Sequence, residues 1–216
     1  MAPYARLEIT LILLLGAVVT VATGYYWQWW SLLPGVLALA LLLFYRDPPR
    51  KTPVGDDLLI AAADGRLMNV QRDYHDGETE TRQLRFVIFL SVFNVHVNRS
   101  PCAGSITQVQ YYPGAFLNAL RPEATDRNEN NLVVIQPKSP LPGPVHVRQI
   151  AGVLARRVVC ALKVGDEVST GQRFGMIKLG SQTEIRVPED PGWEIVVARG
   201  DRVKAGLTVL ARLKRE

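Results

Sequence analysis

The chain has 216 residues, a formal net charge of +5, and 48% hydrophobic against 21% charged residues. This length suits one globular domain with an appendage, and much of the hydrophobic excess lies in the first 45 residues. No basic run is interleaved with aromatic residues, which argues against a nucleic-acid partner, whereas a modest positive charge suits an anionic membrane surface.

Two apolar runs open the chain. Residues 7–25 carry Glu8 as their one ionisable side chain before the tyrosines, and a second apolar run covers residues 32–45. The aromatic cluster at residues 25–30 lies between them, and such clusters are typical of a bilayer interface. The first run is about long enough to span a membrane and the second is short. Residues 1–45 are therefore predicted to form a membrane-anchoring helical hairpin.

Basic residues flank both ends of this hairpin. Arg6 precedes the first run, and Arg46, Arg50 and Lys51 follow the second, where we expect them to face anionic headgroups. The positive-inside rule then places both ends, and the domain that follows, on the cytoplasmic side of the cell membrane. A cleaved signal peptide and a hairpin that dips into one leaflet remain open alternatives.

A proline-rich linker at 46–56 leads into a domain at 57–216 that is predicted to be mainly β. Short apolar runs, many of them β-branched, are separated by Gly, Pro, Asn and Asp residues. The predicted strands fall within residues 58–63, 84–97, 106–112, 132–136, 145–160, 173–179, 195–197 and 208–213. A short helix is expected at 115–120.

An internal repeat lies near the C-terminus. The pattern G-D-x-V-x-x-G occurs at residues 165–171 and again at 200–206, and a short apolar run follows each copy. It resembles the repeated hammerhead of lipoyl-like and biotinyl-like domains. Two similar strand pairs would then lie face to face, with Gly180 and Ser181 on the segment that joins them. Cys102 and Cys160 lie far apart without a CxxC pattern, so neither a metal site nor a disulfide framework is indicated.

Three residues could form a nucleophilic relay. Ser181 follows Gly180, whose missing Cβ would leave the Gly180 carbonyl open to the serine hydroxyl. His96 ends an apolar stretch and is a candidate general base, and Asp64 could orient its imidazole. Each residue also has a plain structural explanation: a Gly-Ser turn, a satisfied core histidine and a turn-forming aspartate.

These stretches together resemble the phosphatidylserine decarboxylase family, in particular its short bacterial and archaeal branch. The similarity covers nearly the whole chain. The matching segments are residues 63–66 (ADGR), 89–99 (FLSVFNVHVNR), 149–152 (QIAG) with 155–157 (ARR), and 173–177 (RFGMI) leading into 180–181 (GS). The N-terminal hairpin and residues 45–48 (YRDP) also match.

The resemblance implies a proenzyme that cuts itself between Gly180 and Ser181 into a β chain, 1–180, and an α chain, 181–216. Ser181 would become a pyruvoyl group that forms a Schiff base with phosphatidylserine and accepts the electrons released as carbon dioxide leaves. Asp64 and His96 match the residues that drive the cut. The resemblance leaves two questions open: whether the protein forms a homodimer, and whether its substrate is an ester or an ether phospholipid.

The sequence departs from the wider family in two places. Longer members carry a second histidine three residues after the first, and here that position is Arg99. One histidine would therefore serve both steps, unless another such as His146 helps. The residue after the serine is Gln182 instead of the more usual Ser, Thr or Arg.

Two other functions fit parts of the sequence. A non-catalytic membrane-anchored adaptor with a lipoyl-like domain would explain the repeat and the hairpin, but not the joint presence of Asp64, His96 and Ser181. A membrane serine hydrolase would use the same three residues, but the serine lacks a G-x-S-x-G elbow. A lipoyl or biotin carrier is disfavoured because Lys178 precedes the Gly-Ser step.

Overall fold

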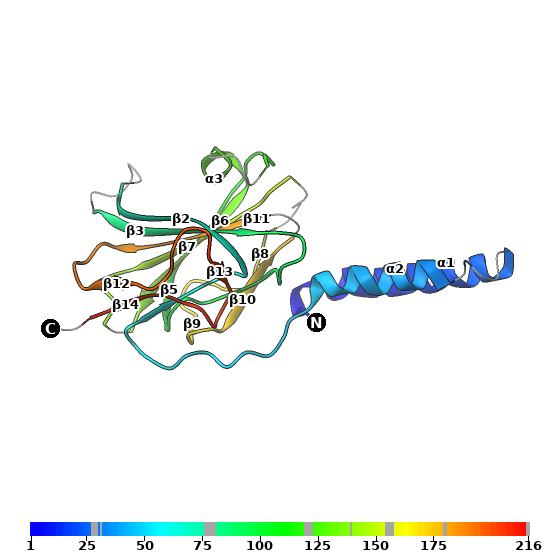
Figure 1. Ribbon diagram of the computed structural model, residues 1–216, viewed down its shortest axis with the longest axis horizontal. Helices are drawn as coiled ribbons and strands as arrows, with labels where there is room; N and C mark the ends of the chain where they lie inside the picture. The colour runs from blue at the N-terminus through cyan, green and yellow to red at the C-terminus, as the bar shows by residue number, and fades with distance from the viewer. Residues whose placement is uncertain are drawn as a thin grey trace. The chain divides into compact units, whose positions relative to one another are not determined.

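The computed structural model describes residues 1–26, 30, 32–75, 81–118, 123–138, 140–153, 158–178 and 181–214. The chain divides into two compact units, Met1–Pro49 and Arg50–Glu216, which are taken separately (Figure 1).

The first unit is a pair of antiparallel helices. Its elements are η1 (Pro3–Ala5), α1 (Arg6–Tyr26), α2 (Leu32–Leu42) and η2 (Leu43–Tyr45). The amide of Ala2 donates to the carbonyl of Tyr45 at 2.7 Å, which ties the two outer ends together. Pro3–Tyr26 is, within the described residues, the one helix long and apolar enough to cross a membrane. The predicted pair of apolar helices is confirmed, although residues 27–29 of the aromatic cluster lie outside the described residues.

Small residues bring the two helices close together. A Cβ on Gly16 would lie 2.6 Å from the Cβ of Ala38, and one on Gly35 would lie 3.3 Å from the Oγ1 of Thr20. Close backbone approach at small residues is how apolar helices associate where the solvent is itself apolar. The large aliphatic side chains point outward, as Leu7 does with 70% of its surface exposed.

The second unit is mainly β, as predicted, and its strands are all antiparallel within three sheets. Its elements are β1 (Leu58–Ile60), β2 (Gly65–Tyr74), β3 (Gln83–Leu90), β4 (Val97–Arg99), β5 (Gly104–Tyr112), α3 (Ala124–Arg127), β6 (Asn130–Pro137), β7 (Val145–Ile150), β8 (Val158–Cys160), β9 (Glu167–Val168), β10 (Arg173–Ile177), β11 (Ser181–Pro188), β12 (Trp193–Ile195), β13 (Arg202–Val203) and β14 (Val209–Leu213). The large sheet has the order β13-β2-β3-β11-β7-β6-β5-β9, and the two small sheets are β1-β14-β12 and β4-β10-β8.

One hydrophobic core joins the three sheets. Phe86 from the large sheet, Phe174 from β10 and Leu59 from β1 are each at most 1% exposed and belong to the same buried cluster. Burying apolar surface of this kind is the main favourable term in folding. The core therefore fixes the small sheets against the inner face of the large one.

The strand order of the large sheet is symmetric about the boundary between β11 and β7. Read outward from there, β11, β3, β2 and β13 correspond to β7, β6, β5 and β9. In the small sheets, β1, β14 and β12 correspond to β4, β10 and β8. The unit thus contains two seven-stranded copies: an inserted copy, β4–β10, and a split copy made of β1–β3 and β11–β14. The inserted copy interrupts the split copy between Leu90 and Ser181.

The G-D-x-V-x-x-G turns take equivalent places in the two copies. Gly165 and Gly200 have φ of 93° and 101°, and Gly171 and Gly206 have φ of 77° and 71°, a region that favours glycine. The amide of Gly165 donates to Ile106 at 2.8 Å, and that of Gly200 donates to Leu67 at the same distance. A Cβ on Gly206 would lie 3.6 Å from the Cα of Gly171, so the two turns meet.

Three local expectations need correction. Residues 115–118 are not helical, because Ala115 forms an isolated bridge with Asn128, and the short helix α3 comes later. β2 and β11 were not among the strands predicted from apolar runs, because their sequences are rich in polar residues. Ser181 begins a strand and does not sit in a turn.

Candidate active site

Ser181 is the first residue of β11, a central strand of the large sheet. It pairs with Leu90 at the end of β3, and the next residue, Gln182, also pairs with Ile150 at the end of β7. Ser181 is fully buried, and its Oγ has no hydrogen-bond partner among the described residues. A buried hydroxyl without a partner is costly, so it marks a site to be explained by chemistry. Gly180, the other half of the predicted cut, lies outside the described residues.

His96 lies on the segment that leaves β3 and enters β4, and it is fully buried. Its carbonyl accepts from the amide of Ile177 at 3.2 Å. Its Nδ1 lies 2.9 Å from the carbonyl oxygen of Asn94. A carbonyl can only accept, so Nδ1 carries a proton, and in the neutral imidazole the lone pair is then on Nε2. Nε2 is therefore the nitrogen that can take a proton.

The insertion explains why His96 and Ser181 lie at the same end of the sheet. Leu90 and Ser181 are paired neighbours, so the chain must leave the split copy and return to it at adjacent points. His96 lies on the outgoing segment, and its carbonyl is bonded to the amide of Ile177 at the end of β10. We call the place where this segment, the end of β10 and the start of β11 meet the seam.

A chain of buried polar side chains joins the seam to the sheet. Asn98 Nδ2 donates to Thr183 Oγ1 at 3.1 Å, and Gln149 Nε2 donates to Asn98 Oδ1 at 2.9 Å. Asn131 Nδ2 donates to Gln149 Oε1 at 3.2 Å. Residues two apart share a face of an extended strand, so Thr183 lies on the same face of β11 as Ser181. This network cannot be predicted from the sequence, because single amides at wide spacing carry no pattern.

The Asn94 turn that holds His96 is likewise not evident from the sequence. Asn94 Oδ1 accepts from the amide of Ser91 at 2.9 Å and from its hydroxyl at 2.8 Å, while the Asn94 amide donates to the Ser91 carbonyl at 2.9 Å. This is the self-bonded turn that asparagine favours. It fixes the carbonyl that binds the imidazole.

Asp64 lies on the turn between β1 and β2, and Arg50 binds its carboxylate. Arg50 Nη1 and Nη2 lie 2.5 and 2.9 Å from the two carboxylate oxygens, and the amide of Ala205 donates to Oδ1 at 2.8 Å. These contacts link Asp64 to Arg50 and Ala205 and not to His96. β2 and β11 flank β3, so the start of β2 is two strand spacings, about 10 Å, from Ser181.

The location of Arg50 overturns one expectation. Its side chain is 5% exposed and forms a buried ion pair, so it does not face lipid headgroups as predicted. A charge this deeply buried is stable only when paired and hydrogen-bonded. Arg50 also donates to the carbonyl of Ala205 at 2.6 Å, which anchors part of the predicted linker on the β unit.

Arg99, which replaces the second family histidine, points away from the seam. Its Nη1 donates to the carbonyl of Gly171 at 3.2 Å, and its Cδ would lie 2.8 Å from a Cβ on Gly206. It therefore supports the meeting of the two glycine turns. His146 pairs with Arg186, five residues along β11 from Ser181, which corresponds to about 17 Å. The structure does not bring His146 to the seam.

The other face of β11 carries a cluster of buried charges. Glu184 is 1% exposed, and its carboxylate forms ion pairs with the Nε atoms of three arginines. These are Arg85 of β3, Arg148 of β7 and Arg186 of β11. The Arg148 Nε lies 3.0 Å from a Glu184 oxygen. Strand neighbours alternate faces, so this cluster is separated from the Ser181 hydroxyl by the sheet itself.

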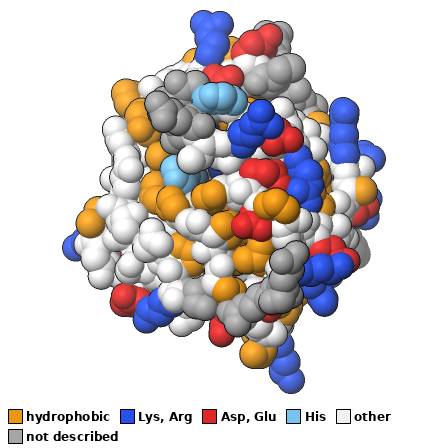
Figure 2. Space-filling model, turned by 90° about the vertical axis from the view of Figure 1, so that its left-hand side faces the viewer, with side chains coloured by type: hydrophobic (Ala, Val, Ile, Leu, Met, Phe, Trp, Pro, Cys, Tyr) orange, Lys and Arg blue, Asp and Glu red, His pale blue; other side chains and the backbone are white. Residues whose placement is uncertain are grey.

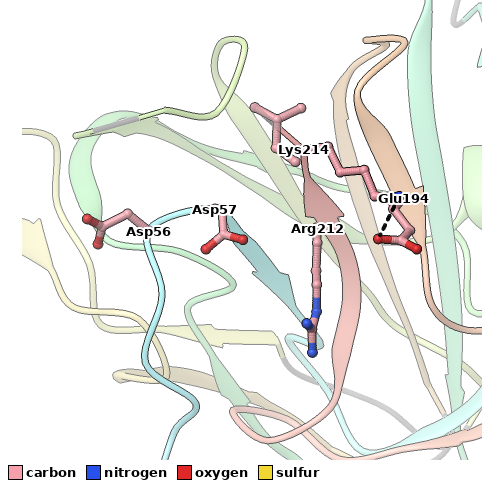
Figure 3. Close-up of a pocket in the computed structure, with 6 residues that line it drawn as sticks. Asp56, Asp57, Glu194, Arg212 and Lys214 are labelled. Atoms are coloured by element: carbon pink, nitrogen blue, oxygen red, sulfur yellow. Dashed lines mark ion pairs between the residues drawn. The ribbon is translucent and has the colours of Figure 1, made fainter. Parts of the chain in front are cut away.

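A pocket among the described residues lies elsewhere. It measures about 560 Å³ and is lined by Asp56, Asp57, Glu194, Arg212, Leu213 and Lys214 (Figure 3). Lys214 and Glu194 form an ion pair at 3.5 Å across it. The pocket lies against the sheet β1-β14-β12 and contains none of the three predicted site residues. Within the described residues, no group of three or more His, Cys, Asp or Glu could hold a metal ion.

Comparison with known proteins supplies the family context. A family model described as phosphatidylserine decarboxylase matches residues 37–211. The phosphatidylserine decarboxylase proenzyme of Rhodopirellula baltica is 44% identical over 217 residues, which cover 97% of this chain and 88% of that protein. The proenzyme of Burkholderia vietnamiensis is 40% identical, with 88% and 85% covered. That of Syntrophus aciditrophicus is 37% identical, with 94% and 93% covered.

Proposed function

Because the chain belongs to the phosphatidylserine decarboxylase family, we propose that it is a self-processing proenzyme that converts phosphatidylserine to phosphatidylethanolamine and carbon dioxide. The observation that carries this proposal within the family is the seam. There a fully buried serine hydroxyl without a described partner and an imidazole with a fixed tautomer lie at the same end of one sheet.

The self-cleavage follows from these two groups. Nε2 of His96 accepts the hydroxyl proton of Ser181 as Oγ attacks the Gly180 carbonyl, and the amide becomes an ester. Loss of the Ser181 α-proton then expels the Gly180 carboxylate by elimination and leaves a dehydroalanine. Water converts the dehydroalanine to a pyruvoyl group with release of ammonia. The products are residues 1–180 and 181–216.

The pyruvoyl group, once present at position 181, supplies a ketone that accepts the electrons released when the substrate carboxylate leaves. The buried start of β11 fits this group, because the apolar core side of the strand excludes water. We assign to His96 the role of holding or returning a proton there. Arg99 has no place in this step, since it is bound to Gly171 on the other side of β4.

We assign Asp64 a positioning role in the same site. The carbonyl of Ala62, two residues earlier, accepts from the amide of Arg99 at 2.9 Å and lies 3.4 Å from Asn98 Nδ2. The turn that Asp64 and Arg50 hold in place therefore supports β4, the strand directly after His96. A direct contact of the Asp64 carboxylate with His96 would be the rival arrangement.

The finer architecture belongs to the same proposal. We take residues 1–45 as the membrane anchor, 46–56 as the linker and 57–216 as a catalytic domain on the cytoplasmic side. The equivalent glycine turns support a hammerhead-type, lipoyl-like ancestry for the two copies. Accessibility of Val164→Cys to a membrane-impermeant reagent, before and after lysis, tests the orientation.

Intact mass under denaturing conditions tests the proposal. Two pieces are expected, and the smaller should lack a free amino terminus. Ser181→Ala should stay at full length, while Ser100→Ala, another fully buried serine, should be cut normally. A wild-type chain that stays whole on long incubation, or a Ser181→Ala chain that is still cut, overturns the assignment. Release of labelled carbon dioxide from phosphatidylserine vesicles then tests the second reaction.

A further inference from the structure

Exposed hydrophobic side chains gather at one end of the β unit. Nine large ones are exposed among the described residues of Arg50–Glu216, and six of these lie at the end of the large sheet where β11 starts. We call these six residues the rim: Val92, Phe93, Tyr111, Tyr112, Phe116 and Val153. Phe93 is 83% exposed and Val153 56%. The other three are Val54, Val164 and Val196.

Strand register places the rim around Ser181. Tyr112 pairs with Asn130, Asn130 pairs with Ile150, and Ile150 pairs with Gln182, so the ends of β5, β7 and β3 form one row. Val92 and Phe93 follow β3 directly, and Val153 follows β7. In Figure 1 the turn after β3 lies at the right-hand side of the β unit.

Asn128 ties the Phe116 segment to the same row. Its Nδ2 donates to the carbonyls of Leu117 and Ala151 at 2.8 and 2.7 Å, and its Oδ1 accepts from the amide of Leu117 at 2.8 Å. Phe116, which precedes Leu117, is 43% exposed. These bonds join the segment that carries Phe116 to the one that carries Val153, so this part of the rim is held by two separate segments.

The opposite side of the molecule has a different character. Figure 2 shows it with acidic and basic side chains interspersed among small hydrophobic areas. Such mixed charge is ordinary solvated surface. Aromatic residues gathered with valines are instead typical of the boundary between lipid and water, where ring edges meet headgroups.

We propose that the rim is a second lipid-contact surface, which enters the headgroup layer and brings the substrate amine to position 181. This rests on the proposed function. Two features favour a bilayer over a protein as the occupant. The chain carries a helix, Pro3–Tyr26, that is suited to cross a bilayer. The tether between Tyr45 and Arg50 can extend at most about 17 Å, which keeps the domain near that bilayer.

The tether also joins the β unit at the rim end. Arg50 is fixed on Asp64, which directly precedes β2, and the first residues of β2 pair with β3 at Phe89, beside Leu90. Chain entry, the rim and Ser181 thus share one end of the large sheet. A lipid held at the rim needs no transfer through water to reach the seam.

The test compares two double variants of the full chain in phosphatidylcholine vesicles. Phe116→Ser/Val153→Ser removes part of the rim, and Val164→Ser/Val196→Ser removes similarly exposed side chains elsewhere. Each is assayed, after complete self-cleavage, on phosphatidylserine in the vesicle and on a short-chain, monomeric phosphatidylserine in solution. Completed cleavage verifies the fold of each variant.

The rim variant should lose about tenfold in kcat/KM on the vesicle lipid and keep its rate on the soluble one, since it gives up interfacial burial only. The control variant should match wild type on both. Equal rates for the two variants on the vesicle lipid would overturn the proposal. So would a rim variant that changes oligomeric state instead, which would identify a second copy as the occupant. A wild-type protein that is inactive on both substrates would instead refute the proposed function.

Discussion

The buried Arg50–Asp64 pair offers the sharpest test of how the site is organised. The two side chains are 5% and 10% exposed, and two N–O contacts of 2.5 and 2.9 Å join them. Removing one partner leaves the other charge buried and unpaired, which costs about 3–5 kcal/mol. We therefore expect Asp64→Asn and Arg50→Gln to lower the free energy of unfolding by similar amounts. If Asp64 only positions β4, both should also slow self-cleavage by similar factors.

Unfolding is best measured by denaturant titration in the Ser181→Ala background, which keeps the chain in one piece. Self-cleavage is followed in the serine background by the appearance of the smaller piece. Arg50→Met/Asp64→Leu should recover much of the lost stability, because it leaves no charge unpaired. Glu167→Gln, which breaks the exposed pair with Lys138, is the control and should change little.

One outcome would refute the positioning role. It is an Asp64→Asn protein that unfolds like wild type yet does not cleave, beside an Arg50→Gln protein that cleaves normally. That pattern would mean that the carboxylate acts on His96 directly, as in the relay first inferred from sequence.

Three further predictions concern single residues. Asn94→Ala removes the acceptor of two hydrogen bonds and should cost about 1–2 kcal/mol and slow self-cleavage, whereas Asn94→Asp, which keeps an acceptor, should restore most of the rate. Arg99→His should lower stability without raising the rate of cleavage or decarboxylation, because the side chain is directed at Gly171; a faster enzyme would contradict this. Burial raises the pKa of Cys102 to about 12 from 9.0, so alkylation at pH 8 should be far slower in the folded protein than in urea. The stability gained from the neutral thiol should be present below pH 9 and fall as the pH rises toward 12.

The sequence indicated most of the strands because their apolar runs are short and bounded by turn residues. It did not indicate β11, in which Ser181, Gln182, Thr183 and Glu184 stand in succession. Gln182, Thr183 and Glu184 can be buried because side chains on other elements bond to them: Thr125 of α3, Asn98 of β4 and Arg148 of β7, respectively. Such partners are distant in sequence, so local periodicity cannot predict them.

In the sequence, the duplication of the β unit is evident only at the two G-D-x-V-x-x-G turns. Positive φ restricts Gly171 and Gly206 to glycine, so these positions keep the pattern. Elsewhere equivalent strands need only an apolar inner face, and different sequences meet that need. The interruption of one copy by the other also breaks any simple repeat spacing. For the site, the residue types of Ser181 and His96 were informative, but the Asn94 carbonyl and the Arg50 partner depend on the folded chain.

The central position of β11 in the large sheet determines whether folding or self-cleavage comes first. Eight residue pairs join it to β3 and five join it to β7, so a cut before Ser181 would free a chain end but not the strand. A separately made 1–180 piece would expose β3 and β7 as open edges, which invite aggregation. Folding therefore has to precede cutting. Once cut and then unfolded, the two pieces would have to find each other by diffusion, so we expect denaturation of the mature protein to be irreversible where that of the uncut chain is not.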